Sequence, residues 1–256
     1  MSTVVQPRAA GRPSSSTYLR FEILRALRSR RYFFFSLGFP LVLYFLIAGP
    51  NRNVTDFADS GISAPLYYMV GLAGFGTMVS ALSAGARIAN ERQVGWTRQL
   101  RLTPLSPRAY ITTKVVMAYV MALLTILLLY AAGAILGVRM PASDWLDMTG
   151  LMLVALIPFA ALGIFLGHLL SVDSVGPLVG GLTGLLAFVS GTWFPLGHGA
   201  LYQIARFLPS YWLVQASHVV LVGHAWSLFG WGVVAVWSVV LAALAAGAYR
   251  RDTRRV

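Results

Sequence analysis

The sequence predicts an all-α polytopic membrane protein, on three observations. Hydrophobic residues make up 57% of the 256 residues and charged residues only 11%, whereas about a quarter of a soluble domain is charged. Apolar stretches of about 20 residues, the length that crosses the hydrocarbon core, recur along the chain. The 20 basic residues outnumber the 8 acidic ones and gather between these stretches. The chain has no cysteine, which excludes disulfide bonds and thiolate metal sites.

Six apolar stretches meet or approach the spanning length, and we expect each to be a transmembrane helix. They cover roughly residues 32–49, 64–87, 111–137, 148–171, 177–193 and 226–248. Of the basic residues, 17 precede the first stretch, follow the last, or lie in residues 87–114. Because basic residues favour the cytosolic side, both termini and residues 87–114 are predicted to be cytosolic, in an inner, cytoplasmic membrane. The basic excess is then topological, and no nucleic-acid partner is expected.

The N-terminal region divides near residue 17. Residues 1–16 are rich in Ser, Pro, Gly and Arg and are predicted to be disordered, so that residues 17–256 form a single transmembrane domain. Phe21, Leu24 and Leu27 recur at helical spacing with arginines between them. This pattern predicts an amphipathic interfacial helix on the inner leaflet, although a basic anchor for the first stretch fits it equally well.

Residues 87–114 form the most patterned polar segment of the chain. Good helix formers run over residues 91–102, which predicts a short amphipathic helix on the cytosolic side, between the second and third spans. The residues that give this helix its apolar and basic faces are Trp96, Leu100, Arg98 and Arg101. A short helix held between two membrane helices suits insertion into the cleft of a partner protein, and a solvated connector is the alternative interpretation.

Two prolines bound the end of this polar segment. Thr103 and Pro104 are expected to stop the short helix, because a proline ring disfavours helical backbone at the residue before it. Ser106 is typical of a helix N-cap, and Pro107 after it suits the first helical position. The third span is therefore predicted to begin at this Ser-Pro pair.

The sequence does not predict an energy source within the chain. Proton- and ion-coupled carriers need ionisable groups inside the membrane. Residues 32–49, 64–86, 115–137, 148–171, 177–193 and 226–248 hold no Asp, Glu, Lys or Arg, and only His168, near the end of a stretch, is available. We interpret it as a helix-end residue at the interface. A phosphate-binding loop needs a Lys followed by Ser or Thr, but the only lysine, Lys114, is followed by valine.

Glycines recur at four-residue spacing inside several apolar stretches. The pairs are Gly133 with Gly137, Gly163 with Gly167, and Gly180 with Gly184. Small residues at this spacing let two membrane helices approach closely. They therefore predict helix packing rather than a phosphate cradle.

The region between the fifth and sixth spans is predicted to be an outer re-entrant hairpin. Its apolar run over residues 211–222 has 12 residues, too few to cross the hydrocarbon core. Three histidines, His198, His218 and His224, lie in this region without an acid or a cysteine beside them. No metal site is expected there.

Two motifs resemble those of the ABC-2 type transporter permeases. In the first, a Glu-x-x-x-Gly element leads through a leucine to Thr-Pro before the third span. Its residues here are Glu91, Gly95, Leu100, Thr103, Pro104 and Pro107. The second is similar to the exit from the family's fifth span into an outer re-entrant hairpin. Its residues are Ser190, Gly191, Phe194, Pro195, Leu208, Pro209 and Trp212. Residues 17–256 fit the family's plan, but Trp96 and Arg98 stand where many relatives carry Thr and an acid.

The resemblance implies the membrane half of an ATP-driven ABC exporter. Two permease subunits, as a homodimer or a related heterodimer, would enclose a path through the membrane lipid. Each would rest its cytosolic coupling helix on a separate ATP-binding subunit, where Arg98 and Arg101 would meet acidic residues. ATP and Mg would bind to that subunit, so this chain would carry no cofactor and no catalytic residue. The substrate would be hydrophobic or amphipathic: a drug, a lipid or a lipid-linked glycan.

Two other functions remain as alternatives. An ion- or proton-coupled secondary transporter would share the six spans, and transport by the chain alone along a pH gradient would identify it. An intramembrane serine protease would use Ser190 with Gly191. The last stretch, however, holds no His to activate that serine, and Phe188 lies where a glycine is needed.

Overall fold

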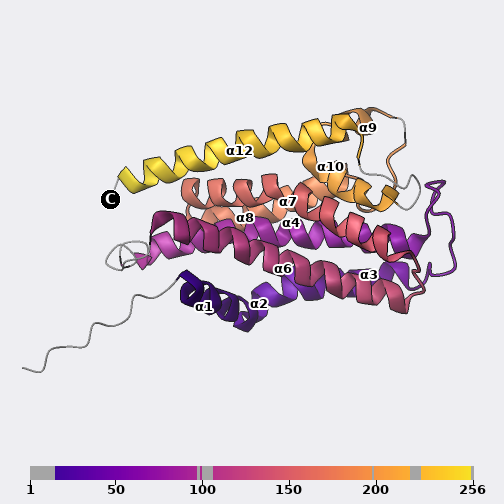
Figure 1. Ribbon diagram of the computed structural model, residues 1–256, viewed down its shortest axis with the longest axis horizontal. Coiled ribbons are helices and arrows are strands. Elements are labelled where there is room, and N and C mark those ends of the chain that lie inside the picture. Colours follow the sequence, from indigo (N-terminus) through magenta and orange to yellow (C-terminus); the bar gives the residue numbers. More distant parts are fainter. Residues whose placement is uncertain (1–14, 97–98, 100–105, 198, 220–225, 255–256) are drawn as a thin grey trace, which may run out of the picture.

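The computed structural model describes residues 15–96, 99, 106–197, 199–219 and 226–254, and within these ranges every regular element is a helix. The long helices lie side by side in one bundle (Figure 1). In chain order, the helices are α1 (Ser15–Arg28), α2 (Arg30–Phe33), the π-helical turn η1 (Phe34–Gly38), α3 (Phe39–Ala48), α4 (Ala64–Gln93), α6 (Pro107–Ile135), α7 (Ala142–Leu169), α8 (Val172–Val189), α9 (Ala200–Ala205), α10 (Pro209–Val214), the 3-10 turn η2 (Gln215–His218) and α12 (Leu228–Arg254).

Five of the described helices are long and apolar enough to cross a membrane, judged by length and composition: α4, α6, α7, α8 and α12. The first predicted span, residues 32–49, is divided into α2, η1 and α3. Its continuous apolar part, Phe34–Ala48, is shorter than the other five helices. Six crossings therefore remain a prediction. Residues 1–14, predicted to be disordered, lie outside the described residues.

The polar segment between the second and third spans is shorter than its composition predicts. The second helix, α4, continues to Gln93, and the third, α6, already begins at Pro107. The separate helix predicted from residue 91 is therefore wrong at its start, because residues 91–93 extend α4. Residues 97, 98 and 100–105 lie outside the described residues, so the rest of that prediction stays open.

Capping chemistry defines where two of the spanning helices begin. Ser63 accepts a hydrogen bond from the backbone N–H of Leu66 (3.4 Å) at the start of α4. Ser106 accepts one from Ala109 (3.2 Å), with Pro107 at the first helical position. The predicted start of the third span is thus confirmed. Serine satisfies a backbone donor that the first helical turn leaves unpaired.

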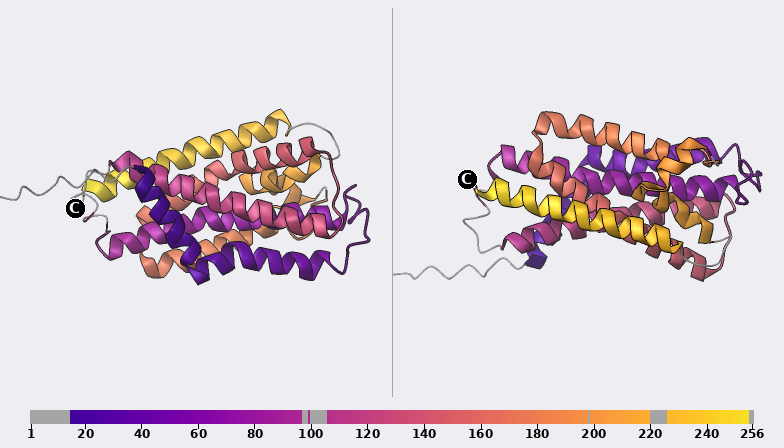
Figure 2. Two further views of the ribbon diagram at one scale, coloured as in Figure 1. Left: turned by 60° about the horizontal axis from the view of Figure 1, so that its bottom comes forward. Right: turned by 90° about the horizontal axis from the view of Figure 1, so that it is seen from above.

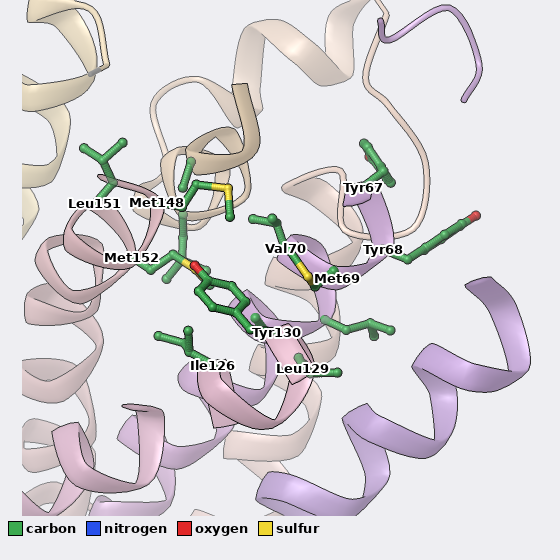
Figure 3. Close-up of a cluster of buried hydrophobic side chains, with 14 of the residues drawn as sticks. Tyr67, Tyr68, Met69, Val70, Ile126, Leu129, Tyr130, Met148, Leu151 and Met152 are labelled. Carbon is green, nitrogen blue, oxygen red and sulfur yellow. The ribbon is translucent and has the colours of Figure 1, made fainter. Parts of the chain in front are cut away.

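The central helix is α4, which contacts α3, α6, α7 and α8. Its spanning window is 83% buried, whereas those of α8 and α12 are only 22% buried. Figure 3 shows the core where side chains of α4 and α6, among them Met69 and Tyr130, meet Met148 and Met152 of α7. The helices α8 and α12 are peripheral, and most of their surface is left for lipid or for another subunit.

Glycine pairs pack helices at some of the predicted positions and not at others. A Cβ added to Gly163 would lie 2.4 Å from the carbonyl oxygen of Ala81, and one added to Gly167 would lie 2.6 Å from that of Gly85. The packing prediction is confirmed here, since α4 and α7 touch backbone to backbone. A Cβ at Gly180 or Gly184 would meet nothing within 4 Å. On α8 the predicted packing is therefore wrong within this chain.

The two ends of the bundle differ in content (Figure 1). At the α1 end lie α1, the C-terminal turns of α4, α7 and α12, and the first turn of α6. At the α10 end lie residues 49–63, α9 and α10. Figure 2 shows α1 crossing the bundle at a steep angle instead of running along it. The predicted re-entrant hairpin corresponds to two short helices, α9 and α10, of 6 residues each. Their depth in a membrane stays a prediction.

Candidate functional site

The only lysine of the chain is buried at the α1 end, between three helices. Lys114, on α6, is 1% exposed. Its ammonium group donates to Oε1 of Glu22 on α1 (2.8 Å) and to Oε1 of Glu91 on α4 (2.5 Å). Ion pairs at this depth must be matched closely, because an unpaired buried charge is costly. One ammonium group therefore ties α1, α4 and α6 together.

Two tyrosines complete this group of side chains. Tyr110 donates from its hydroxyl to Oε2 of Glu91 (2.7 Å), and Tyr18 donates to Oε1 of Glu22 (3.1 Å). Both carboxylate oxygens of Glu91 thus have a donor. We call these five residues the Lys114 cluster: Tyr18, Glu22, Glu91, Tyr110 and Lys114. Its hydrogen bonds are satisfied from within the chain.

The protonation states on α1 follow from these contacts. Burial alone would raise the pKa of the Glu22 carboxyl group, but the adjacent Lys114 ammonium group and its hydrogen bond hold that pKa below the ordinary value of 4.5. Burial raises the pKa of the Tyr18 hydroxyl, and the negative charges of Glu22 and Glu91 raise it further. At neutral pH, Glu22 is therefore ionised and Tyr18 remains a donor.

A second ionic group joins α4 to α7 and α12. Arg92 pairs through Nε with Oδ2 of Asp252 on α12 (2.9 Å), and Nδ1 of His168 on α7 lies 3.0 Å from the same oxygen. Arg92 also donates to the carbonyl oxygens of Gly167 (3.0 Å) and Leu170 (3.3 Å), where α7 ends. We call Arg92, His168 and Asp252 the Arg92 cluster. His168 lies in the last turn of α7, which confirms that it is a helix-end residue, and it is 6% exposed; its position at the membrane interface stays a prediction.

Two consecutive residues of α4 therefore connect to four other helices. Glu91 belongs to the Lys114 cluster, which joins α1 and α6, and Arg92 belongs to the Arg92 cluster, which joins α7 and α12. Successive residues on a helix are about 100° apart, so neighbours naturally face different partners. We call this pair of residues the α4 hub. It lies in the last turn of α4.

The chain turns directly after the α4 hub. Gly95 has φ +70°, and its N–H donates to the carbonyl of Arg92 (3.2 Å), which ends α4. Glycine adopts this left-handed backbone without strain, and it is the usual residue after a helix C-cap. Trp96, half-buried, follows. The other predicted coupling residues, Arg98, Leu100, Arg101, Thr103 and Pro104, lie outside the described residues. Glu91 faces the chain's own interior.

The first helix turns two of its predicted interfacial residues away from the protein. Glu22 and Ala26, one turn apart, are buried. Phe21 and Leu24 point away and are 67% and 41% exposed. The side chain of Leu27 lies outside the described residues. An exposed apolar face next to buried polar contacts is what a helix at a membrane interface needs.

The predicted outer residues cluster where α8 ends. Ser190 is buried, and its hydroxyl donates to the carbonyl of Ala187 (3.1 Å) and lies 3.2 Å from that of Thr192. Gly191 has φ +80°, and its carbonyl accepts a hydrogen bond from Tyr67 of α4. Because the serine is bonded to its own helix and a threonine, these contacts give the protease alternative no base. The exit from α8 is instead held against α4.

The other outer residues hold α10 in place. Trp212 donates from Nε1 to the carbonyl of Arg206 (2.9 Å), and its ring leaves no room for a Cβ at Gly230 of α12. Pro209 is buried at the first position of α10. Phe194 packs edge-on against Phe188. Pro195 lines a polar cavity of about 480 Å³ together with Ser190, Gly191, Asp59 and Gln215.

Among the described residues, no group of three or more His, Asp or Glu side chains could hold a metal ion. His198 and His224, considered above as candidate ligands, lie outside the described residues. An apolar groove of about 780 Å³ runs between η1, α3, α4 and α8. Its walls include Phe35, Phe39 and Phe75, and Arg87 and Asn90 line its α1 end. We call it the α4–α8 groove.

Sequence reasoning missed most of the two clusters. No role was predicted for Glu22, Arg92, Tyr110 or Asp252, and Lys114 was considered only for a phosphate-binding loop. Two local signals were available: Tyr18 and Glu22, and Tyr110 and Lys114, are each four residues apart and hence on one helix face. The partner of each pair lies on another helix, and no local signal identifies it.

Comparison with known proteins places the chain in a family. Residues 49–249 match the family model described as ABC-2 family transporter protein. A Bacillus subtilis (strain 168) protein named transport permease YvfS is 30% identical over 196 residues, which is 74% of this chain and 78% of that protein. The family match includes the α4 hub, and both matches are to membrane transport proteins. The chain is therefore a multi-pass membrane protein that belongs to the family of ABC-2 type transporter permeases.

Proposed function

We propose that this chain is the membrane subunit of an ATP-driven exporter and that residues 96–105 dock on a separate ATP-binding subunit. The observation that carries the proposal is the α4 hub. The docking segment begins directly after Gly95. The two residues of the hub, Arg92 and Glu91, lie three and four residues before Gly95. A force applied to the docking segment would reach α4 first. It would then reach α1, α6, α7 and α12 through the ion pairs of Glu91 and Arg92.

The chain would lie in the inner membrane of the cell, and its α1 end would face the cytosol. Basic residues outnumber acids there, and positively charged segments favour the cytosolic side. Phe21 and Leu24 would enter the interface of the inner leaflet, since they are exposed on α1. This orientation would bring residues 96–105 within reach of a cytosolic ATPase.

The α4–α8 groove is the path that we propose for the substrate. Its volume of about 780 Å³ suits a small or amphipathic molecule, and its walls are mainly aromatic and aliphatic. A second permease subunit would close it, because α8 is only 22% buried in its spanning window. Arg87 and Asn90 at one end would meet a polar or anionic head group. The substrate class that fits is a hydrophobic or amphipathic molecule with one polar end.

The proposal can be tested by purifying the complex through a tag on this chain. The complex should contain an ATP-binding subunit and hydrolyse ATP, whereas the chain alone should show no ATP turnover. Trp96→Ala should weaken the association of the two subunits by about 2 kcal/mol, as loss of a central aromatic anchor does. Trp237→Ala is the matched control, because this tryptophan is half-buried, as Trp96 is, but lies on α12, away from the α1 end.

The α4 hub is tested in proteoliposomes that contain the complex. Arg92→Gln should leave the ATPase subunit bound but lower the amount of transport per ATP hydrolysed. The reason is that the end of α4 loses its ion pair to α12 and its charged hydrogen bonds to the end of α7. Arg139→Gln, an exposed residue beyond α6, should leave transport unchanged. Transport by the chain alone along a pH gradient would refute the proposal and favour a coupled carrier. Unchanged coupling in Arg92→Gln would refute the role of the hub.

A further inference from the structure

A second groove lies between α6, α7 and α12 and shares no lining residue with the α4–α8 groove. Its volume is about 830 Å³. Alanines form its floor: Ala160 and Ala161 on α7, and Ala242, Ala245 and Ala246 on α12. On α12, Ala242 lies three and four residues before Ala245 and Ala246, and on α7 the lining residue Ile157 lies three and four residues before Ala160 and Ala161, so each set shares one face. Small side chains at the seam of two helices leave room for a chain-like molecule.

The third wall comes from α6. Ile111, Val115 and Tyr119 lie four residues apart along one face of that helix and line the groove. At a rise of 1.5 Å per residue, the 11 steps from Arg108 to Tyr119 cover about 16 Å. Half of a hydrocarbon core of about 30 Å is close to the same length. The groove therefore has the length of one leaflet.

The α1 end of the groove is basic and polar. Arg108, in the first turn of α6, and Arg250, in the last turns of α12, both line it, together with Thr112 and Tyr249. No aspartate or glutamate is among the residues that line this groove. The polar end therefore complements an anion.

We propose that this groove binds one anionic phospholipid of the leaflet at the α1 end. Its phosphate would lie between the guanidinium groups of Arg108 and Arg250, and one acyl chain would follow the alanine seam toward Tyr119. Guanidinium groups match the geometry of phosphate oxygens with paired hydrogen bonds. Basic pockets between transmembrane helices are a known kind of site for anionic head groups. The lipid is a bound component, since its site is separate from the groove proposed for transport.

Charge complementarity argues against a second protein helix as the occupant. A helix in the seam would cover Arg108 and Arg250 and would have to supply acids for both. The chain has only 8 acidic residues, and five of them, Glu22, Asp56, Glu91, Asp144 and Asp252, already accept hydrogen bonds or ion pairs within the chain. A phospholipid supplies the anion and the apolar chain in one molecule, and it surrounds the protein at high concentration.

The test is native mass spectrometry of the full chain released from nanodiscs. The nanodiscs contain equal amounts of phosphatidylglycerol and phosphatidylcholine with identical acyl chains. The wild-type chain should retain one phosphatidylglycerol in preference to phosphatidylcholine. Arg108→Ala with Arg250→Ala should lower that preference about tenfold or more, since each basic residue near a surface adds about fivefold. Arg28→Ala with Arg251→Ala removes the same charge from exposed positions at the same end and should retain the lipid.

A second pair of variants tests the acyl chain without changing charge. Ala246→Trp fills the groove and should displace the lipid, whereas Ala243→Trp, on an exposed position outside the lining, should not. Equal retention of the two lipids by the wild-type chain would overturn the proposal. Equal loss in the two arginine pairs would also overturn it, as would a lipid unaffected by Ala246→Trp. If the wild-type chain is detected as a dimer and these groove variants are detected as monomers, the groove binds a second copy of the chain and the lipid proposal is overturned.

Discussion

The two ends of this bundle are held by different kinds of contact. At the α1 end, ion pairs centred on Lys114 and Arg92 join five helices, and most of the side chains are buried. At the α10 end, tyrosine hydroxyls donate to backbone carbonyls. Tyr67 bonds to Gly191 and Tyr68 bonds to Trp193 (3.3 Å). Aromatic rings pack around them, as Trp212 does on Tyr211 and Trp226.

The two kinds of contact, ion pairs and aromatic packing, suit the two ends to different roles. Buried ion pairs add little net stability over an apolar core, but they accept only particular partners at particular distances. Aromatic packing stabilises through area and tolerates small shifts. The α1 end can therefore hold one defined arrangement and lose it as a unit, whereas the α10 end can adjust gradually. This fits a protein that is driven from one end.

The largest effect that this comparison predicts is at Lys114. Lys114→Met leaves the carboxylates of Glu22 and Glu91 buried without their cation, which should lower the free energy of unfolding by about 3–5 kcal/mol. Thermal unfolding of the purified protein in detergent measures it. Adding Glu22→Gln and Glu91→Gln to Lys114→Met should recover much of the loss. A cost below about 1 kcal/mol for the single variant would contradict the ionic account of this end.

At the α10 end the corresponding change should cost less. Tyr67→Phe removes the hydroxyl that donates to the Gly191 carbonyl and leaves that acceptor buried, which should cost about 1–3 kcal/mol. The ring contacts with Phe57 and Tyr68 remain. The same unfolding measurement compares the two ends directly. A loss larger than that of Lys114→Met would reverse the comparison.

Acid should weaken the α1 end selectively. Because the pKa of Glu22 is lowered below 4.5 by folding, its contribution is present above that ordinary value and is lost as the pH falls through the lower, folded one. Hydrogen exchange in α1 should therefore speed up below about pH 4.5, with α10 unaffected. The variant Glu22→Gln should abolish this dependence in α1. Equal acceleration in both helices would show global unfolding and defeat the prediction.

The smallest effect concerns the outward face of α1. Phe21→Ala should change the free energy of unfolding in detergent by less than about 0.5 kcal/mol, because the side chain is 67% exposed. In bilayers the same variant should release α1 from the interface, measured by the depth of a spin label attached on this helix. Substitution of Ala26, fully buried on the opposite face, should affect stability instead.

The sequence predicted what depends on composition and local chemistry. Apolar length identified α4, α6, α7, α8 and α12, and serine with proline identified the start of α6. Apolar length does not reveal the π-helical turn η1 within the first predicted span, and that crossing stays a prediction. Equal spacing of glycines could not distinguish Gly163 from Gly180. A Cβ added at Gly163 would clash with α4, whereas one added at Gly180 would meet no described atom within 4 Å.

The clusters could not be predicted because they depend on how each helix is rotated about its axis. Lys114 is 92 residues from Glu22 and 23 from Glu91 in the chain. Helices that are apolar on every side do not reveal which face is inward. A long helix that continues past its apolar stretch, as α4 does to Gln93, also hides charged residues in what composition marks as a loop.

The adjacency of Glu91 and Arg92 also constrains how such proteins can be recombined. Inserting or deleting one residue in α4 ahead of Glu91 would turn both side chains by about 100° and misdirect both at once. Among the described residues, none lies within 4 Å of the position that a Cβ at Gly95 would take. A chimera that receives the docking segment of another permease should therefore be joined at Gly95, where the exchange alters partner choice and leaves the membrane helices in register.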